Sequence, residues 1–104
     1  MELVITTQPT PELYVIAVEG EIDISNASKL RDAIDLALEQ PTDTVQLDFE
    51  KVAYIDSTGI GVLVGAVHHA EEHGKRFSVV NAQPGVMRVM QLLGVDSEID
   101  VTAL

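Results

Sequence analysis

The sequence of 104 residues contains no cysteine and no tryptophan, and only 4% of its residues are aromatic. The absence of cysteine excludes a disulfide framework and cysteine-based zinc sites. Because aromatic residues are scarce, a hydrophobic core must be built from Val, Ile, Leu and Ala. Hydrophobic residues make up 46% of the chain, which is ample for a globular protein of this length. We therefore expect one domain spanning residues 1–104.

Positive charge and long apolar segments are also scarce. Six Lys and Arg stand against 17 Asp and Glu, for a formal net charge of −11. Nucleic acid and anionic membrane surfaces would repel such a chain, whereas a basic protein would attract it. The same charge can also serve only to keep a small protein soluble. No signal peptide or run of ~20 apolar residues is present. The sequence thus predicts a cytoplasmic protein without nucleic-acid or membrane partners.

Apolar spacing predicts strands and helices that alternate after residue 12. The expected strands are residues 3–5, 13–18, 45–49, 77–81 and 99–101. The expected helices run from Ser25 or Asn26 to Pro41, from Asp56 or Ser57 to about Gly74, and from Pro84 to Gly94. This alternation favours an α/β or α+β sandwich, in which helices pack on one sheet.

The switch from strand to helix after residue 49 is the most informative feature. Residues 50–53 are expected to form a short link, and a helix pattern begins after Asp56. Asp and Ser are both good N-cap residues, so this helix is expected to start at Asp56 or Ser57. Unpaired N–H groups and a partial positive charge at a helix N-terminus suit an anion. The Ser57 hydroxyl therefore either caps the helix or carries a phosphate. The expected core stripe of the helix is Ile60, Leu63, Val64, Val67 and Ala70.

The opposite face of the same helix has few charged side chains. At 100° per residue, this face carries Thr58, Val62, Gly65 and Ala66, which are expected to face solvent next to Ser57. A smooth, weakly apolar strip allows close approach of a partner at little desolvation cost. Scattered apolar residues on a surface are also common and need no function. From the residues alone, both interpretations stay open.

Several kinds of catalytic or metal site do not match this stretch. No lysine follows the glycines as in a phosphate-binding loop, and Ile55 stands where a hydrolase elbow has glycine. All three histidines lie at least three helical turns beyond Ser57, about 16 Å or more by helix rise. His69 and His73 are spaced to share a metal, but no third ligand stands out, and a solvated helix face is the better interpretation. We expect no enzyme activity, cofactor or metal.

The segment around Ser57 resembles a known family. Residues 48–63, with Asp56-Ser57-Thr58-Gly59 at their centre, resemble the signature of bacterial anti-sigma factor antagonists, which are single STAS domains. Residues 20–23 and 84–95 extend the resemblance over most of the chain. It implies a mixed sheet of four to five strands, with three to four helices packed mainly on one face.

The resemblance also implies a mechanism. Ser57 matches the serine that a partner kinase phosphorylates in this family, and that kinase is itself an anti-sigma factor of the GHKL ATPase type. The unphosphorylated protein would bind the kinase and free the sigma factor, phosphorylation would abolish binding, and a PP2C-type phosphatase would reset the switch. The alternative is a structural or regulatory STAS subunit of another assembly, such as a lipid transport complex, with Ser57 as a helix cap.

The loops that follow the second and fourth strands are expected to join the surface around Ser57. They contribute Asp23, which can equally be a turn or cap residue, and Asn81, for which a turn role is the stronger alternative. The complete set of expected partner-binding residues is Asp23, Asp56, Thr58, Gly59, Gly61, Val62, Gly65, Ala66 and Asn81.

Overall fold

Five strands form one mixed sheet in a computed structural model that describes residues 2–104. The strands are β1 (Val4–Pro9), β2 (Leu13–Ile22), β3 (Thr44–Ile55), β4 (Arg76–Ala82) and β5 (Asp100–Ala103), in the spatial order β1-β2-β3-β4-β5. β1 pairs antiparallel with β2, and every other neighbouring pair is parallel. Parallel neighbours require crossover connections. The helices that supply them are α1 (Ala27–Leu38), α2 (Ser57–Glu72) and α3 (Pro84–Leu92), with a 3₁₀ turn at Val95–Ser97.

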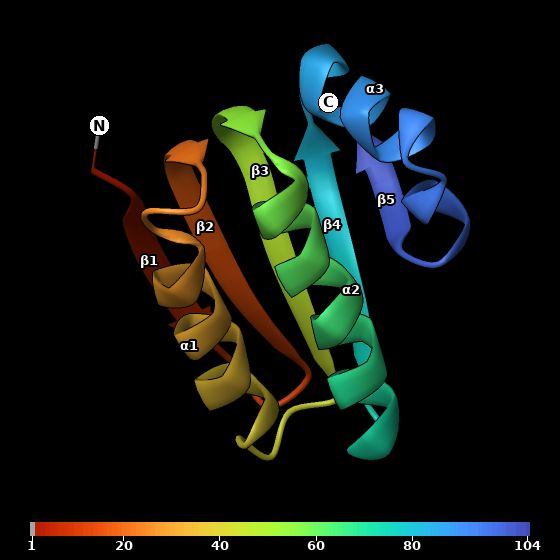
Figure 1. Cartoon of the computed structure of the whole chain (residues 1–104). Coiled ribbons are helices and arrows are strands. Elements are labelled where there is room, and N and C mark those ends of the chain that lie inside the picture. The colour runs from red at the N-terminus through yellow and green to blue at the C-terminus, as the bar shows by residue number, and fades with distance from the viewer. Residues whose placement is uncertain (1) are drawn as a thin grey trace.

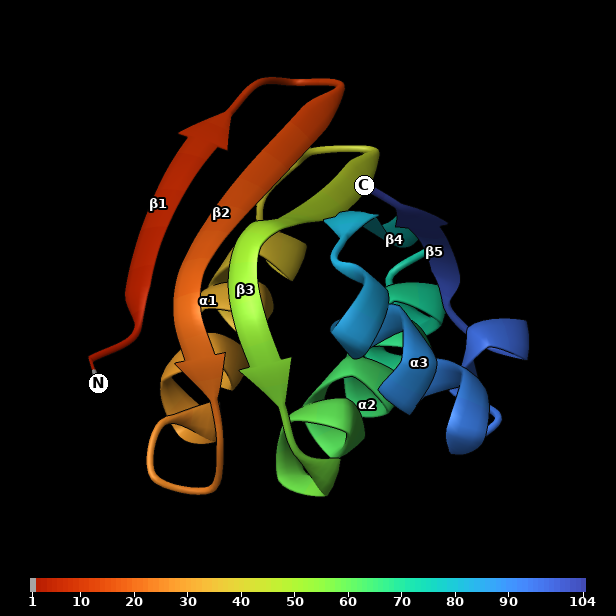
Figure 2. The same ribbon diagram turned by 90° about the horizontal axis from the view of Figure 1, so that it is seen from above.

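The three helices lie on the same side of the sheet. Figure 1 shows α1, α2 and α3 in front of the strands, and Figure 2 shows that the sheet curves around them. This arrangement confirms the expected mixed sheet with helices mainly on one face. In residues 2–104, no helix is both long enough and apolar enough to cross a membrane.

The core lies between the helices and the concave face of the sheet. Alternate residues of β2 and β3, such as Ile16, Leu47 and Phe49, are fully buried there, as the strand period requires. Most of the core is aliphatic, but Tyr14 and Phe77 are also buried. The few aromatic residues are therefore used mainly inside the protein.

Residues 50–53, expected to be a link, are part of strand β3. The strand continues to Ile55, and its pairing with β2 shifts register between Ala17 and Glu19 and again between Gly20 and Glu21. These irregularities break the alternation of buried and exposed side chains, so that Val52 and Ile55 are buried three residues apart. A simple period-2 pattern therefore ends before the strand does.

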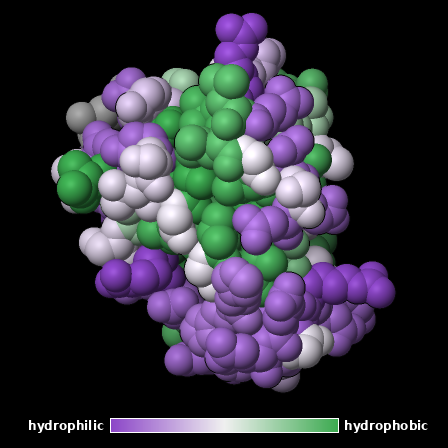
Figure 3. All heavy atoms as spheres, turned by 45° about the vertical axis from the view of Figure 1, so that its right-hand side comes forward, coloured by the Kyte–Doolittle hydropathy of each residue, from purple (hydrophilic) through white to green (hydrophobic). Residues whose placement is uncertain are grey.

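The buried face of α2 is rotated from the expected position. Ile60, Leu63 and Ala70 are buried as predicted, but Val64 and Val67 are only half-buried. The side of the molecule that carries α2 and α3 shows a strip of hydrophobic surface bordered by hydrophilic side chains (Figure 3). The expected core stripe thus lies partly at the surface.

Helix α3 stops at Gly94 as expected, but one of its predicted core residues is exposed. Val86 and Met90 are buried, Val89 is half-buried, and Leu93 is 52% exposed although it was expected to face inward. The helix ends at Leu92, and Gly94 takes a left-handed conformation with φ 71°. Leu93 therefore lies beyond the last turn, where its side chain does not return to the core.

Candidate functional site: the start of α2 and the groove beside α1

Helix α2 begins where strand β3 leaves the sheet, and Asp56 is its N-cap. An Asp56 carboxylate oxygen accepts a hydrogen bond of 3.0 Å from the Gly59 N–H, and the Asp56 N–H donates to the Ile22 carbonyl at 3.1 Å. Ser57 is therefore the first residue of the helix, as expected. The alternative role of Ser57 as the helix cap is wrong, because the Asp56 carboxylate occupies the capping position.

The Ser57 side chain is exposed. In residues 2–104, no side-chain hydrogen bond involves its hydroxyl. Its backbone stands in the first turn of a 16-residue helix, where N–H groups lack intrahelical partners and the helix dipole is positive. A phosphoryl group on this oxygen would meet water on one side and a favourable helix end on the other. The site can therefore accept a negative charge without unfolding the domain.

Gly59 is buried under the first turn of α2 rather than presented to a partner. A Cβ atom at this position would lie 2.7 Å from side-chain carbons of both Ile22 and Ile55. The glycine lets the helix start pack directly on the paired ends of β2 and β3. Its expected place on the partner-binding surface is therefore corrected to a packing position.

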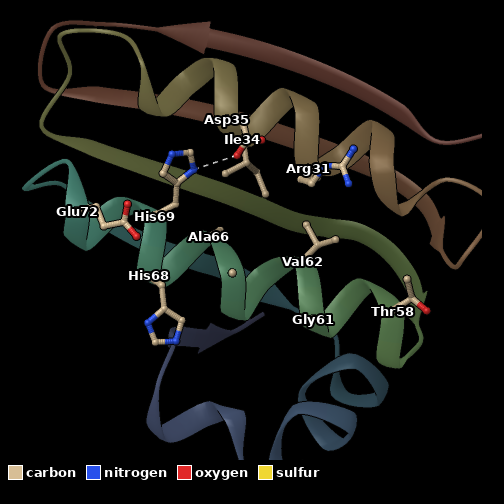
Figure 4. Close-up of a pocket in the computed structure, with 11 residues that line it drawn as sticks. Arg31, Ile34, Asp35, Thr58, Gly61, Val62, Ala66, His68, His69 and Glu72 are labelled. Carbon is tan, nitrogen blue, oxygen red and sulfur yellow. Dashed lines mark hydrogen bonds and ion pairs between the residues drawn. The ribbon is translucent and has the colours of Figure 1, made fainter.

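A groove of ≈ 430 Å³ runs between α1 and α2, starting near the N-terminus of α2 (Figure 4). We call it the α1–α2 groove. Its lining residues are Arg31, Ile34, Asp35, Thr58, Gly61, Val62, Gly65, Ala66, His68, His69 and Glu72. In Figure 4, Val62 points toward α1, whereas His68 points away from it.

Five of the expected partner-binding residues line this groove: Thr58, Gly61, Val62, Gly65 and Ala66. Their spacing on the helix predicted that all of them face solvent, and for two of them this prediction is wrong. Ala66 is buried and Val62 is half-buried. The reason is that α1 packs alongside this flank of α2. The sequence pattern of one helix could not reveal which neighbour covers it.

The far end of the groove is bridged by a histidine–aspartate contact. His69 Nδ1 lies 3.1 Å from an Asp35 carboxylate oxygen, which links α2 to α1. The rings of His69 and His73 stand edge to face with centroids 4.7 Å apart. Residues 2–104 contain no cluster of three or more His, Asp or Glu side chains suited to a metal ion. His69 is thus engaged with a carboxylate of the neighbouring helix.

The groove also contains Arg31, Ile34 and Asp35, which were not among the site residues predicted from the sequence. They lie on α1, whose packing against α2 depends on the order of strands in the sheet. The spacing of Arg31 and Asp35, four residues apart on a helix, was the available signal. It indicates a shared face but not what that face meets.

Asp23 lies at the same end of the sheet as Asp56, where β2 and β3 finish. It follows Ile22, which pairs with Ile55, the residue before Asp56. The Asp23 carboxylate accepts hydrogen bonds from the hydroxyl and the N–H of Ser25, and these bonds lower the pKa of Asp23. The expected turn role of Asp23 is confirmed, and the residue also stands beside the start of α2.

Asn81 stands near the carboxyl end of β4. Its side-chain amide donates to an Asp48 carboxylate oxygen at 3.1 Å, and its backbone is left-handed with φ 60°. Asp48 pairs with Val80, whereas β3 continues beyond that level to Ile55. The carboxyl ends of β2, β3 and β4 lie at the same end of the sheet (Figure 1), and the place of Asn81 on the partner-binding surface stays a prediction.

Loss of the Asp56 cap gives a first prediction. Asp56→Ala should lower the free energy of unfolding by about 1 kcal/mol, because the Gly59 N–H loses its acceptor. Asp56→Asn should retain most of the stability, since Asn caps helices as well as Asp. Urea denaturation measures both variants, and equal losses for Ala and Asn would contradict the capping role.

Comparison with known proteins places this architecture among described relatives. A family model described as "Mlab, STAS domain" matches residues 5–102. The anti-sigma-B factor antagonist of Bacillus subtilis is 31% identical over 88 residues, covering 85% of this chain and 80% of the relative.

Two solved structures have the same fold. One is the anti-sigma factor antagonist SpoIIAA in its unphosphorylated form, with a TM-score of 0.79 and 27% identity, covering 94% of this chain and 87% of that chain. The other is the Bacillus cell fate determinant SpoIIAA in its phosphorylated form, with a TM-score of 0.72 and 26% identity, covering 94% and 90%.

Proposed function

Because the chain belongs to the STAS domain family, we propose that it is an anti-sigma factor antagonist switched by phosphorylation of Ser57. The observation that carries this proposal is an exposed hydroxyl at the first position of α2, in a helix that is already capped by Asp56. A serine freed from capping is available for modification. The relative SpoIIAA has been solved in unphosphorylated and phosphorylated forms, which supports the same chemistry here.

The glycines of the α1–α2 groove support a docking role. A Cβ atom at Gly61 or Gly65 would have no neighbour within 4 Å, so the fold does not need glycine at either position. Glycine inside a helix nevertheless costs about 0.8–1 kcal/mol relative to alanine. A partner that approaches the helix backbone closely accounts for this cost. Thr58, Val62 and Ala66 then provide the remaining floor of the contact.

Charge provides the switch. A phosphate on Ser57 adds about −1.5 to −2 charge near pH 7. Asp23 and Asp56 already stand at the same end of the sheet, on a chain with net charge −11. A partner surface that fits this acidic end of the sheet beside a neutral serine cannot accommodate the phosphate. Binding would have to remove water from the added dianion and would bring it close to other negative charges. We infer that unphosphorylated protein binds its partner and phosphorylated protein releases it.

The proposed partner is an anti-sigma factor that is also a serine kinase of the GHKL ATPase type. Binding of the unphosphorylated antagonist would keep this kinase away from its sigma factor, and kinase activity on Ser57 would end that binding. A PP2C-type serine phosphatase would restore the free hydroxyl. This cycle takes place in the cytoplasm, and the chain supplies the regulated surface rather than a catalytic group.

The groove glycines give a second prediction. Gly61→Ala and Gly65→Ala should each raise the free energy of unfolding by about 0.5–1 kcal/mol and weaken binding of the partner kinase. Gly85→Ala is the matched control, because Gly85 lies in α3 and a Cβ there also meets open space. Thermal unfolding and calorimetric titration measure the two effects. Unchanged affinity in both groove variants would contradict docking at these positions.

The proposal is tested directly in the cells that make the protein. Intact mass measurement of the isolated chain, followed by peptide mapping, should find a phosphate on Ser57 in a fraction of the molecules. If Ser57 stays unmodified under every growth condition, the switch is wrong. A STAS subunit of another assembly, such as a lipid transport complex, then becomes the better interpretation.

A further inference from the structure

Strand β1 is an exposed sheet edge. It lies at the outer end of the sheet in both views, with no other element beyond it (Figures 1 and 2). Residues of β1 (Val4–Pro9) carry no charge, and β1 contains no bulge in its pairing with β2. The opposite edge, β5, has only four residues and includes Asp100. Short length and charge protect an edge against pairing with another chain, and β1 has neither protection.

The pairing register shows which backbone groups of β1 are free. The Thr10 N–H donates to the Leu13 carbonyl at 2.9 Å. Because hydrogen-bonded pairs alternate in an antiparallel ladder, the groups of residues 4, 6 and 8 then point toward β2. The N–H and C=O groups of Ile5 and Thr7 point away from the sheet. This outward edge therefore offers two donors and two acceptors.

The two ends of this edge are already accounted for. Pro9 has no N–H to leave unpaired. At the other end, the Leu3 carbonyl accepts a hydrogen bond of 2.6 Å from Lys29 Nζ of α1. Pro9, which lacks a donor, and Leu3, whose acceptor is occupied, therefore stand at opposite ends of this edge.

We propose that two copies of this chain pair through β1, antiparallel about a twofold axis at Thr6. In this register Ile5 of each copy lies opposite Thr7 of the other, and all their outward groups are used in roughly four N–H···O bonds. Pro9 of each copy falls opposite Leu3 of the other. The missing proline donor thus meets the carbonyl that Lys29 already satisfies. The edge is complementary to itself.

The side chains around the edge permit this approach. Helix α1 packs mainly on β2 and β3, and Lys29 of α1 reaches the start of β1. Val4 is 49% exposed and would lie opposite Gln8 of the second copy. Each copy carries a net charge of −11, which opposes association at long range and is screened by salt. The dimer is therefore weak at low ionic strength and becomes more populated as salt is added.

Cysteine substitution tests the register, since the natural chain has no cysteine. In the proposed dimer, Thr6 of one copy lies opposite Thr6 of the other in a non-hydrogen-bonded pair. The Cα atoms of such a pair are about 4.5 Å apart, within disulfide range. Thr6→Cys should therefore give a disulfide-linked dimer under mild oxidation. Val4→Cys and Gln8→Cys are matched controls on the same sheet face. Each alone should cross-link slowly, whereas a mixture of the two should form a mixed disulfide dimer.

Sedimentation of the wild-type protein provides the second measurement and needs no substitution. The average mass should rise with concentration and with added salt, and Thr7→Pro should reduce that rise by removing an outward donor. Equal cross-linking rates for Thr6→Cys and Gln8→Cys would overturn the proposed register. A wild-type protein that stays monomeric at every concentration and salt would overturn the dimer. Neither outcome affects the proposed role of Ser57.

Discussion

Ser57→Asp is expected to weaken binding of the partner kinase by about a hundredfold or more, equivalent to about 3 kcal/mol. The substitution places a permanent negative charge at the first position of α2, beside Asp56. A helix N-terminus stabilises such a charge by about 0.3–1 kcal/mol, so the free energy of unfolding should be unchanged or slightly raised. Loss of affinity without loss of stability locates the effect in the interface.

Two further variants separate charge from shape at this site. Ser57→Ala removes the hydroxyl without adding charge, and it should bind the kinase even when ATP is present. Gln91→Glu adds the same unit of charge on α3, at an exposed position outside the α1–α2 groove, and should leave affinity unchanged. Calorimetric titration measures all three. If Ser57→Asp bound as tightly as wild type, the charge mechanism would be wrong.

Gly59→Ala is expected to be the most destabilising single-methyl substitution in α2. Its Cβ would sit 2.7 Å from carbons of both Ile22 and Ile55, which are themselves buried. Overpacking of this kind typically costs about 1–3 kcal/mol, because the helix start or both strand ends have to shift. In a domain of this size, each 1 kcal/mol lowers the melting temperature by roughly 4–8 °C.

Gly61→Ala is the control for that effect. It makes the same chemical change two residues later in the same helix, but its Cβ meets open space. It should therefore gain the helix propensity of alanine, about 0.5–1 kcal/mol, rather than lose stability. Thermal unfolding should shift in opposite directions for the two variants. A stabilised Gly59→Ala would contradict the packing described for the start of α2.

The start of α2 could be predicted from sequence because it depends on local chemistry. The change of apolar period and the capping preference of Asp placed the helix boundary at Asp56 and Ser57, where the structure has it. Gly94 likewise ended α3 as expected, since a left-handed residue favours glycine. Such signals involve neighbours in the chain and need no knowledge of tertiary packing.

The rest of the site depends on contacts between elements distant in sequence. Helix α1 covers the flank of α2 that carries Ala66. The sequence of neither helix indicates that the two are neighbours. The bulges that carry β3 on to Ile55 arise from its pairing with β2 and break the period on which strand prediction relies.

The measurement that tests the central claim most directly is a calorimetric titration of the purified partner kinase with the antagonist in two forms. One is unphosphorylated, and the other carries a phosphate on Ser57 confirmed by mass. The account predicts tight binding of the first form and binding of the second that is weaker by more than about a hundredfold. Equal affinities would contradict the phosphorylation switch, whatever the fold and the groove suggest.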